Sequence, residues 1–179
     1  TKAKLLDENP MQDPESPRQK QSLPRYLTLE ESIQLLESVD GKNAERDFCI
    51  LTLFLNCGLR ISELCGLNLS DVRGDRLRVL GKGNKERVIY LNVACQSAIE
   101  DWLTVRSTSG AADPCALFIT RKHTRVTKDG VHYMIKKRLT AAGLDSSKYS
   151  AHKLRHTAAT LMLQNGVDVR TLQEILGHE

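Results

Sequence analysis

The spacing of apolar residues predicts helices from residue 28 onward. Thr28, followed by Glu31 three residues later, has the form of a capping box, so a helix is expected from residue 28 to about Val39. In the next stretch, 43–57, apolar residues cover most of the helical circumference, which predicts a helix central to the core, ending at Gly58. The apolar face expected of the first helix consists of Leu29, Ile33, Leu35 and Leu36.

In the middle of the chain the apolar period falls to two. Leu77 and Val79, then Val88 and Tyr90, alternate with polar neighbours on either side of a glycine-containing turn at 81–85, which predicts a β-hairpin. Further helices are expected at 92–105, 127–142, 151–165 and 168–176, with a short strand at 117–119. The pattern therefore predicts an α+β chain that is mainly α-helical with one small antiparallel sheet.

Residues 1–24 differ from the rest because they hold four of the five prolines and show no apolar period. This composition predicts a linker or terminal arm before a domain at 25–179. The 179 residues contain neither a run of about 20 apolar residues nor the layout of a signal peptide. A cytoplasmic protein without a membrane partner is expected.

The cysteines change this picture little. Their number is odd and no two stand at C-x-x-C spacing, so neither a zinc ribbon nor a disulfide framework is expected. We interpret them as reduced thiols that pack as small hydrophobic groups, and we expect no metal. The residues concerned are Cys49, Cys57, Cys65, Cys95 and Cys115.

The net charge of +4 is concentrated in one segment. Residues 121–138 hold seven basic residues and one acidic residue, so this window carries +6 while the remainder of the chain is slightly acidic. A solvated helix face and a surface that follows phosphates are both compatible with such a run. The basic residues are Arg121, Lys122, Arg125, Lys128, Lys136, Lys137 and Arg138.

One pair of residues suggests an anion site, and a second pair has the spacing of a structural brace. His152 and Arg155 stand three apart at the start of a predicted helix, where an arginine fork, an imidazole and the helix end together suit a phosphate. Arg60 precedes Glu63 by one helical turn, so the carboxylate is placed to brace the arginine or its backbone. His156, next to Arg155, is expected to face the interior in a packing or backbone-bonding role.

Four stretches, taken in order, resemble the catalytic domain of the tyrosine recombinases, the phage-integrase and Xer-like family. The resemblance extends from about residue 23 to the end of the chain. The stretches are GLRISEL at 58–64, GKGNKER at 81–87, HKLRH at 152–156 and LGH at 176–178.

The resemblance implies catalytic roles for five residues. Arg60 and Arg155 would hold the scissile phosphate and stabilise the charge of its transition state. Lys82, on the hairpin, would protonate the departing 5′ oxygen, His152 would assist proton transfer and His178 would hydrogen-bond the phosphate. No metal or other cofactor is implied.

Further implied residues surround these five. Glu63 and Asp71 match family positions that brace the site. DNA-backbone contacts are expected from Lys85 and Arg87 beside the hairpin turn, and from the basic window. The expected contacts in that window are Arg121, Lys122, Arg125, Lys136, Lys137 and Arg138.

The nucleophile of this family is a tyrosine shortly after the last histidine, and no tyrosine of this chain occupies that place. Tyr26, Tyr90, Tyr133 and Tyr149 all precede the HKLRH stretch. We therefore expect a catalytic domain that is incomplete at its C-terminus, lacks the family's N-terminal DNA-clamping domain and is inactive alone. Supply of the tyrosine by a neighbouring protomer is the alternative.

The implied partners are double-stranded DNA and further recombinase protomers in a tetrameric synapse. Two other functions remain open at this point. A type IB topoisomerase uses similar arginine, lysine and histidine chemistry, and a regulatory relative would bind DNA without cutting it. The GKGNKER hairpin and the proline-rich lead-in favour a recombinase.

Overall fold

Helix α2 (Ala44–Cys57) is the central element of the fold, which a computed structural model describes over residues 25–106 and 112–177. Its side chains are apolar nearly all round, and Ile50 and Phe54 are among those fully buried. The prediction of a core helix is therefore confirmed. A helix that is apolar on all sides is stable only where other elements cover every side.

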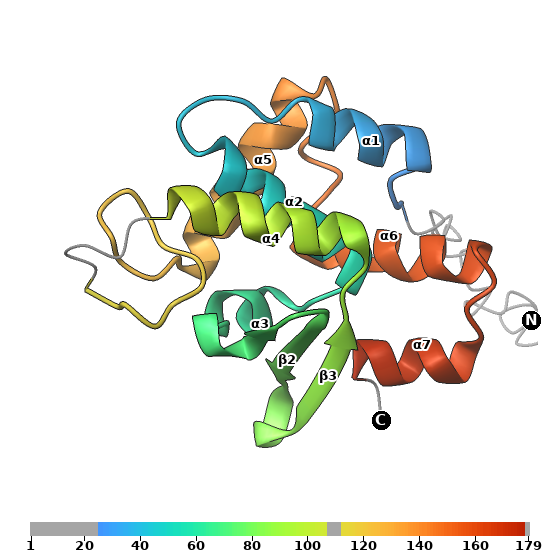
Figure 1. Ribbon diagram of the computed structural model, residues 1–179. Coiled ribbons are helices and arrows are strands. Elements are labelled where there is room, and N and C mark those ends of the chain that lie inside the picture. Colours follow the sequence, from blue (N-terminus) through green and yellow to red (C-terminus); the bar gives the residue numbers. More distant parts are fainter. Residues whose placement is uncertain (1–24, 107–111, 178–179) are drawn as a thin grey trace, which may run out of the picture.

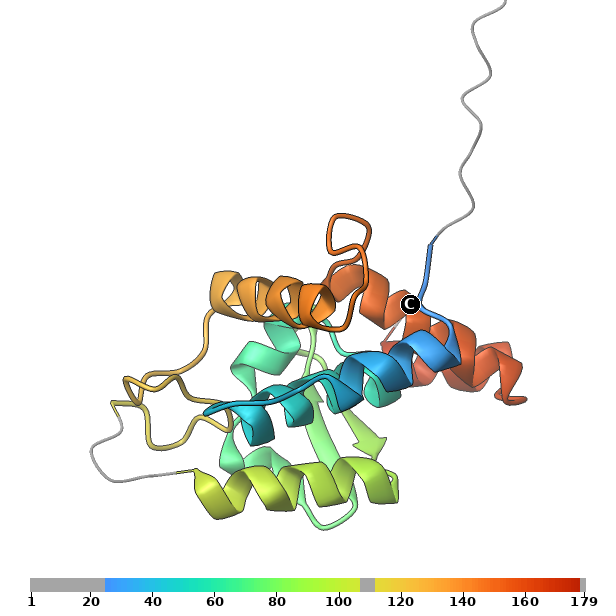
Figure 2. The same cartoon turned by 90° about the horizontal axis from the view of Figure 1, so that it is seen from above.

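Other helices surround α2 and carry the site at one end of the molecule. Helices α4 and α6 pack along α2, and α7 lies against α6 and strand β3 (Figure 1). Seen from above, α4 and α5 lie on opposite sides of α1 (Figure 2). Their bounds are α1 (Leu29–Glu37), α3 (Ile61–Gly66), α4 (Val93–Val105), α5 (Lys128–Ala141), α6 (Ala151–Gln164) and α7 (Val169–Leu176).

Helix α1 begins as predicted but buries a different face. The Thr28 hydroxyl accepts a hydrogen bond from the Glu31 N–H at 3.1 Å, and the Glu31 carboxylate accepts one from the Thr28 N–H at 2.9 Å. Leu35 is buried, whereas Leu29 and Ile33 are exposed, so that part of the predicted apolar face is wrong. Ser32 takes an inward place because its hydroxyl donates to the Thr28 carbonyl, which satisfies the buried polar group.

The predicted hairpin lies in a three-stranded antiparallel sheet of order β1-β2-β3. In β3, the core-facing residues are Arg87 and Ile89, not Val88 and Tyr90, which are exposed. The register explains this difference, since Leu77 stands opposite Ile89 and one residue of shift reverses the faces of a strand. The strands are β1 (Val72–Arg73), β2 (Arg76–Leu80) and β3 (Glu86–Tyr90).

The short strand predicted at 117–119 is not present, although two isolated bridges lie beside it. Leu117 and Phe118 are buried there. The Leu117 carbonyl accepts hydrogen bonds from the Trp102 indole and the Arg106 guanidinium. Side-chain donors therefore satisfy a backbone group that a strand partner would otherwise satisfy.

Three of the cysteines pack in the core as predicted: Cys49, Cys57 and Cys95 are buried, while Cys115 is exposed.

Across the described residues, every helix is too short or too polar to cross a membrane.

Candidate functional site

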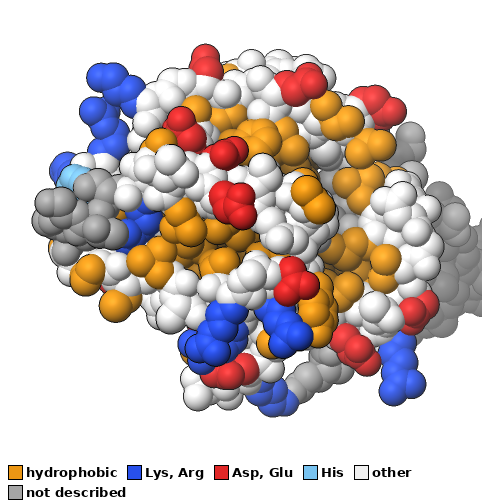
Figure 3. Space-filling model, viewed as in Figure 1, with side chains coloured by type: hydrophobic (Ala, Val, Ile, Leu, Met, Phe, Trp, Pro, Cys, Tyr) orange, Lys and Arg blue, Asp and Glu red, His pale blue; other side chains and the backbone are white. Residues whose placement is uncertain are grey.

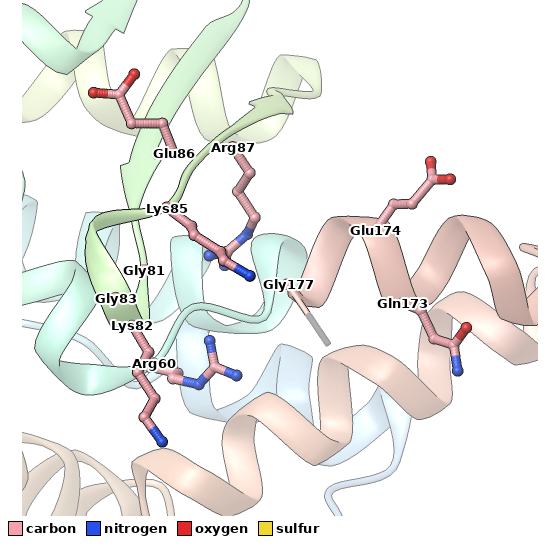
Figure 4. A pocket seen from close by; sticks show the side chains of 10 residues that line it. All are labelled: Arg60, Gly81, Lys82, Gly83, Lys85, Glu86, Arg87, Gln173, Glu174 and Gly177. Atoms are coloured by element: carbon pink, nitrogen blue, oxygen red, sulfur yellow. The ribbon is translucent and has the colours of Figure 1, made fainter. Parts of the chain in front are cut away.

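A pocket of about 730 Å³ opens where the hairpin, the start of α3 and the end of α7 meet. The basic side chains of Arg60, Lys85 and Arg87 point toward its centre, whereas Glu86 and Glu174 point away (Figure 4). The pocket is therefore electropositive inside, which suits an anionic ligand. The residues that line it are Arg60, Gly81, Lys82, Gly83, Lys85, Glu86, Arg87, Gln173, Glu174 and Gly177.

Glu63 binds two of the arginines that line this pocket. One carboxylate oxygen accepts hydrogen bonds from Arg60 Nη1 at 3.0 Å and Arg87 Nη1 at 2.7 Å. The other accepts from the Arg60 backbone N–H at 2.8 Å and from Arg87 Nη2 at 3.0 Å. The predicted brace between Arg60 and Glu63 is thus present, and the carboxylate also caps the N-terminus of α3.

The environment of Glu63 keeps its carboxylate ionised. Burial by itself raises the pKa of Glu63, but hydrogen bonds from Arg87 and Arg60 and the nearby Arg87 charge outweigh it. The pKa of Glu63 therefore lies below its ordinary value. A permanent negative charge beneath two guanidiniums fixes their orientation.

Arg87 joins the hairpin to α7. Besides its two bonds to Glu63, its Nε donates to the Ile175 carbonyl at 2.8 Å. Gly177 ends α7 in the left-handed conformation, and a Cβ placed there would stand 3.1 Å from Arg87 Nη1. Arg87 was predicted as a DNA contact, yet its guanidinium is committed to these internal partners and its side chain is only 13% exposed.

Arg155 holds two helix ends together behind the pocket. It is buried, and it donates from Nη1 to the Gly58 carbonyl at 2.5 Å and from Nη2 to the Leu176 carbonyl at 2.7 Å. A cation is favourable at carbonyls that end helices α2 and α7. Burial, followed by the nearby Arg60 charge, lowers the pKa of Arg155 to about 10, so it remains protonated at neutral pH.

Lys82 lies at the exposed tip of the hairpin, in the turn between β2 and β3. Gly83 and Asn84 adopt positive φ there, which makes the turn tight. Lys82 lies beside Arg60 at the edge of the pocket (Figure 4). The structure thus brings Lys82 and Arg60 together, as their predicted roles require.

The histidines are placed differently. His152 is exposed in the first turn of α6 and does not line the pocket. His156 is exposed too, which corrects its predicted inward role: at four residues from His152 it lies on the same face of α6, with the two Nε2 atoms 2.9 Å apart. His178 lies outside the described residues.

Asp71 does not line the pocket. Its carboxylate accepts hydrogen bonds from the Asn68 N–H and from Arg78 Nε, both at 2.8 Å. Because Arg78 belongs to β2, Asp71 supports the strand that leads to the hairpin.

The basic window does not form one surface. Arg138 was predicted to contact DNA, but it is buried and its guanidinium pairs with Asp47 at 2.7 Å, so that prediction is wrong. Arg125 pairs with Asp113 at 2.7 Å and donates to the Cys65 and Leu67 carbonyls. The guanidiniums of Arg138 and Arg125 therefore connect elements of the fold to one another instead of forming a surface for the DNA backbone.

The other predicted contacts of the window are divided between one half-buried lysine and three exposed side chains. Lys136 donates to the carbonyls of Ser146 and Tyr149. Arg121, Lys122 and Lys137 are exposed. Figure 3 shows a second gathering of Lys and Arg side chains over the sheet, at the lower edge of the face seen in Figure 1.

Sequence reasoning missed the contribution of α7 and the inward role of Arg87. Gln173 and Glu174 line the pocket but carry no motif of their own. The alternation along β3 held a usable signal, because Arg87 stands two residues before buried Ile89 and so shares its face. None of the four tyrosines, all of which are described, lines the pocket.

Comparison with known proteins gives a consistent result. The sequence model described as the phage integrase family matches residues 25–179. The tyrosine recombinase XerC of Caldanaerobacter subterraneus subsp. tengcongensis is 56% identical over 178 residues, covering 99% of this chain and 50% of the relative. The XerC of Corynebacterium glutamicum is 40% identical over 168 residues, covering 91% and 54%. The chain therefore spans about half the length of the curated relatives it matches.

Solved structures agree with the sequence comparison. The crystal structure of XerA recombinase superposes with a TM-score of 0.79 at 31% identity, covering 88% of this chain and 57% of that one. A XerH site-specific recombinase bound to a palindromic difH substrate gives 0.75 at 29% identity, covering 88% and 47%.

Proposed function

The chain belongs to the phage integrase family, and we propose that it is the catalytic domain of a site-specific recombinase that breaks and rejoins double-stranded DNA. In this proposal residues 25–179 form the catalytic domain and residues 1–24 a linker or arm. The resemblance to a XerH recombinase in complex with its difH substrate supports DNA as the ligand. The active assembly is a tetrameric synapse of recombinase protomers.

The observation that carries the proposal is the arginine arrangement around Glu63. Glu63 accepts a hydrogen bond from Nη1 of Arg60. Within the described residues, Nε and Nη2 of Arg60 have no hydrogen-bond partner. Arg60 lines the pocket (Figure 4), and a guanidinium with two open donors can bind two oxygens of a phosphodiester. Arg155 adds a second positive charge from behind, so negative charge that builds on the phosphate is stabilised without a metal.

The reaction we propose takes its residue roles from the family resemblance. A tyrosine hydroxyl attacks phosphorus, the bond to the 5′ oxygen breaks and a 3′-phosphotyrosyl link forms. Lys82, on the exposed hairpin tip, gives its proton to the departing 5′ oxygen, and His152 assists proton transfer. His178 is assigned a hydrogen bond to the phosphate. Rejoining reverses these steps, so the energy of the broken bond is kept in the protein–DNA link.

The nucleophile in this proposal comes from outside the 179 residues, either from the same longer protein or from a neighbouring protomer. The four tyrosines of the chain stand away from the pocket lining. Tyr90 and Tyr133 are on exposed surfaces elsewhere, with 69% and 72% of their area accessible.

Covalent capture on nicked DNA tests the proposal. The chain is compared with a version that carries its natural sequence beyond Glu179, each alone and as Arg60→Ala and Lys82→Ala variants. We expect a denaturant-resistant protein–DNA adduct from the longer protein only, lost in Arg60→Ala and slowed in Lys82→Ala. DNA binding without an adduct from either wild-type protein would instead establish a non-catalytic DNA-binding relative.

A further inference from the structure

Two histidines on the solvent face of α6 approach each other closely. His152 and His156 are four residues apart, and their Nε2 atoms are separated by 2.9 Å. The ring centroids are 4.5 Å apart, with the planes at 84°. Both residues are exposed on the surface of α6.

This separation fits a metal chelate. Two imidazole nitrogens that bind Cu²⁺ or Ni²⁺ at about 2.0–2.1 Å and at right angles stand roughly 2.9 Å apart, whereas tetrahedral Zn²⁺ needs a wider separation of about 3.3–3.4 Å. Histidines at i and i+4 share one helix face, the arrangement by which a helix supplies two ligands to zinc. For Cu²⁺ and Ni²⁺ the fit needs only small rotations of the two rings, because the nitrogens already stand at the required separation.

The hydrogen bond between the two rings is also compatible with metal binding. A hydrogen bond between two Nε2 atoms requires at least one neutral ring as the acceptor. The ion takes the place of the shared proton, and a ring with its proton on Nδ1 presents a lone pair at Nε2. Neutral imidazole is the form that binds Zn²⁺, Ni²⁺ and Cu²⁺.

We propose that His152 and His156 form a two-histidine site for a divalent transition-metal ion such as Zn²⁺, Ni²⁺ or Cu²⁺. Among the described residues no group of three or more His, Cys, Asp or Glu side chains is placed to hold a metal, so water completes the coordination. A site with two protein ligands at the surface exchanges its ion readily. It therefore differs from a closed structural zinc site.

Occupancy of this site has a consequence that rests on the proposed function. The ion binds Nε2 of His152, the histidine assigned to assist proton transfer, and removes that nitrogen from the reaction. Transition metals then inhibit strand cleavage reversibly, and a chelator restores it. Mg²⁺ does not inhibit, because it prefers oxygen ligands.

Calorimetric titration of the chain with NiCl₂ and ZnCl₂ tests the binding step alone. We expect one ion per chain. His156→Ala and His152→Ala should each weaken binding by roughly 10–100-fold or more, since loss even of an outer-shell partner has that effect. Matched controls are His132→Ala on α5 and Cys115→Ser, which leave the pair intact and should bind as the wild type does. Undiminished binding in His156→Ala, with its helical content unchanged, overturns the proposal.

Cleavage by the longer protein tests the consequence, with each variant compared with its own metal-free rate. The wild type should lose activity on titration with Zn²⁺ and recover with EDTA, whereas His156→Ala should resist Zn²⁺. Equal inhibition of both proteins would overturn the link between the pair and activity. Absence of cleavage in metal-free wild type would count against the proposed function, while the calorimetric result would still decide the metal site.

Discussion

Glu63 is the residue on which the arginine geometry of the pocket depends. Its side chain is only 2% exposed and contacts two guanidiniums and a backbone N–H. Because the carboxylate is ionised and buried, replacing it by a neutral group leaves Arg87 with an uncompensated charge in a largely desolvated place.

Glu63→Gln should therefore lower the free energy of unfolding by about 3 kcal/mol, the scale for breaking a buried ion pair from one side. Urea denaturation at pH 7 measures this value. Glu86→Gln is a suitable control, because its ion pair with Arg78 is exposed to solvent on both sides and its loss should change stability much less.

The effect of Glu63→Gln should also depend on pH. The pKa of Glu63 in the folded protein lies below its ordinary value of 4.5. Its ionised form thus stabilises the fold fully above pH 4.5, and the contribution is lost as pH falls through the lower folded-state pKa. The stability gap between wild type and variant should shrink between pH 5 and pH 3 on this reasoning. A gap that stays constant over this range would contradict the assignment.

At the scale of elements, the docking of α7 depends on a close approach to the end of α2. Gly58 ends α2 with φ of +61°, and a Cβ there would stand 2.5 Å from Leu176 Cδ2. An added methyl group would thus push α7 away from Arg155 and Arg87, which donate hydrogen bonds to its last carbonyls.

Gly58→Ala should destabilise the domain by the left-handed strain of roughly 1–2 kcal/mol and by a further overpacking cost of about 1–3 kcal/mol. Gly74→Ala is the matched control, since Gly74 has φ of +60° and no atom near its Cβ position, so it should show the strain alone. Thermal unfolding of both variants separates the two contributions. Equal losses would show that the contact with Leu176 carries no energy.

Helix α5 is tied to α2 by a buried ion pair. Arg138 and Asp47 are each about 5% exposed and meet at 2.7 Å. Arg138→Gln should lower the free energy of unfolding by roughly 1–3 kcal/mol, because one oxygen of the buried Asp47 loses its donor. Arg46 still pairs with the other oxygen at 2.8 Å, so the charge of Asp47 keeps one partner. The exposed neighbour of Arg138 provides the control: Lys137→Gln should change stability by less than about 0.5 kcal/mol. Chemical denaturation of the two variants compares them directly, and similar values would contradict the buried role.

The sequence predicts elements better than it predicts faces and partners. Helix starts such as Thr28 are set by residues three positions apart, and this information is local. Arg138 resembles its surface neighbours in the sequence, and only packing against Asp47, far away in the chain, distinguishes it. The inward turn of Arg87 could be inferred from its alternation with Ile89, but its partner on α7 is encoded by no local pattern.

At the scale of the whole molecule, positive charge is divided among several places. Lys82 and Lys85 belong to the pocket and hairpin, whereas Lys42 lies in the connection between α1 and α2 at the far end of the molecule (Figure 1). Only cations that contact phosphates release counterions when DNA binds.

Binding of the proposed DNA ligand should weaken steeply with salt. Lys85→Gln should reduce the slope of log K against log salt concentration by about 0.9, the value for one lost phosphate contact. Lys42→Gln removes the same charge far from the pocket and should leave the slope unchanged. Fluorescence anisotropy over a range of salt concentrations measures both. An unchanged slope in Lys85→Gln would show that the hairpin does not contact DNA phosphates.

The bonds of Arg155 also bear on the order in which the protein matures. Arg155 donates to Gly58, 97 residues earlier, and Leu27 donates its N–H to Thr157, 130 residues later. Such distant pairings carry a large loop-closure cost and form late in folding. During synthesis the first strands and helices emerge well before α6 and α7, so the pocket stays unassembled until the last turns of the domain have left the ribosome. Under the proposed function, a nascent chain therefore does not bind a phosphate in this pocket until the catalytic domain has folded.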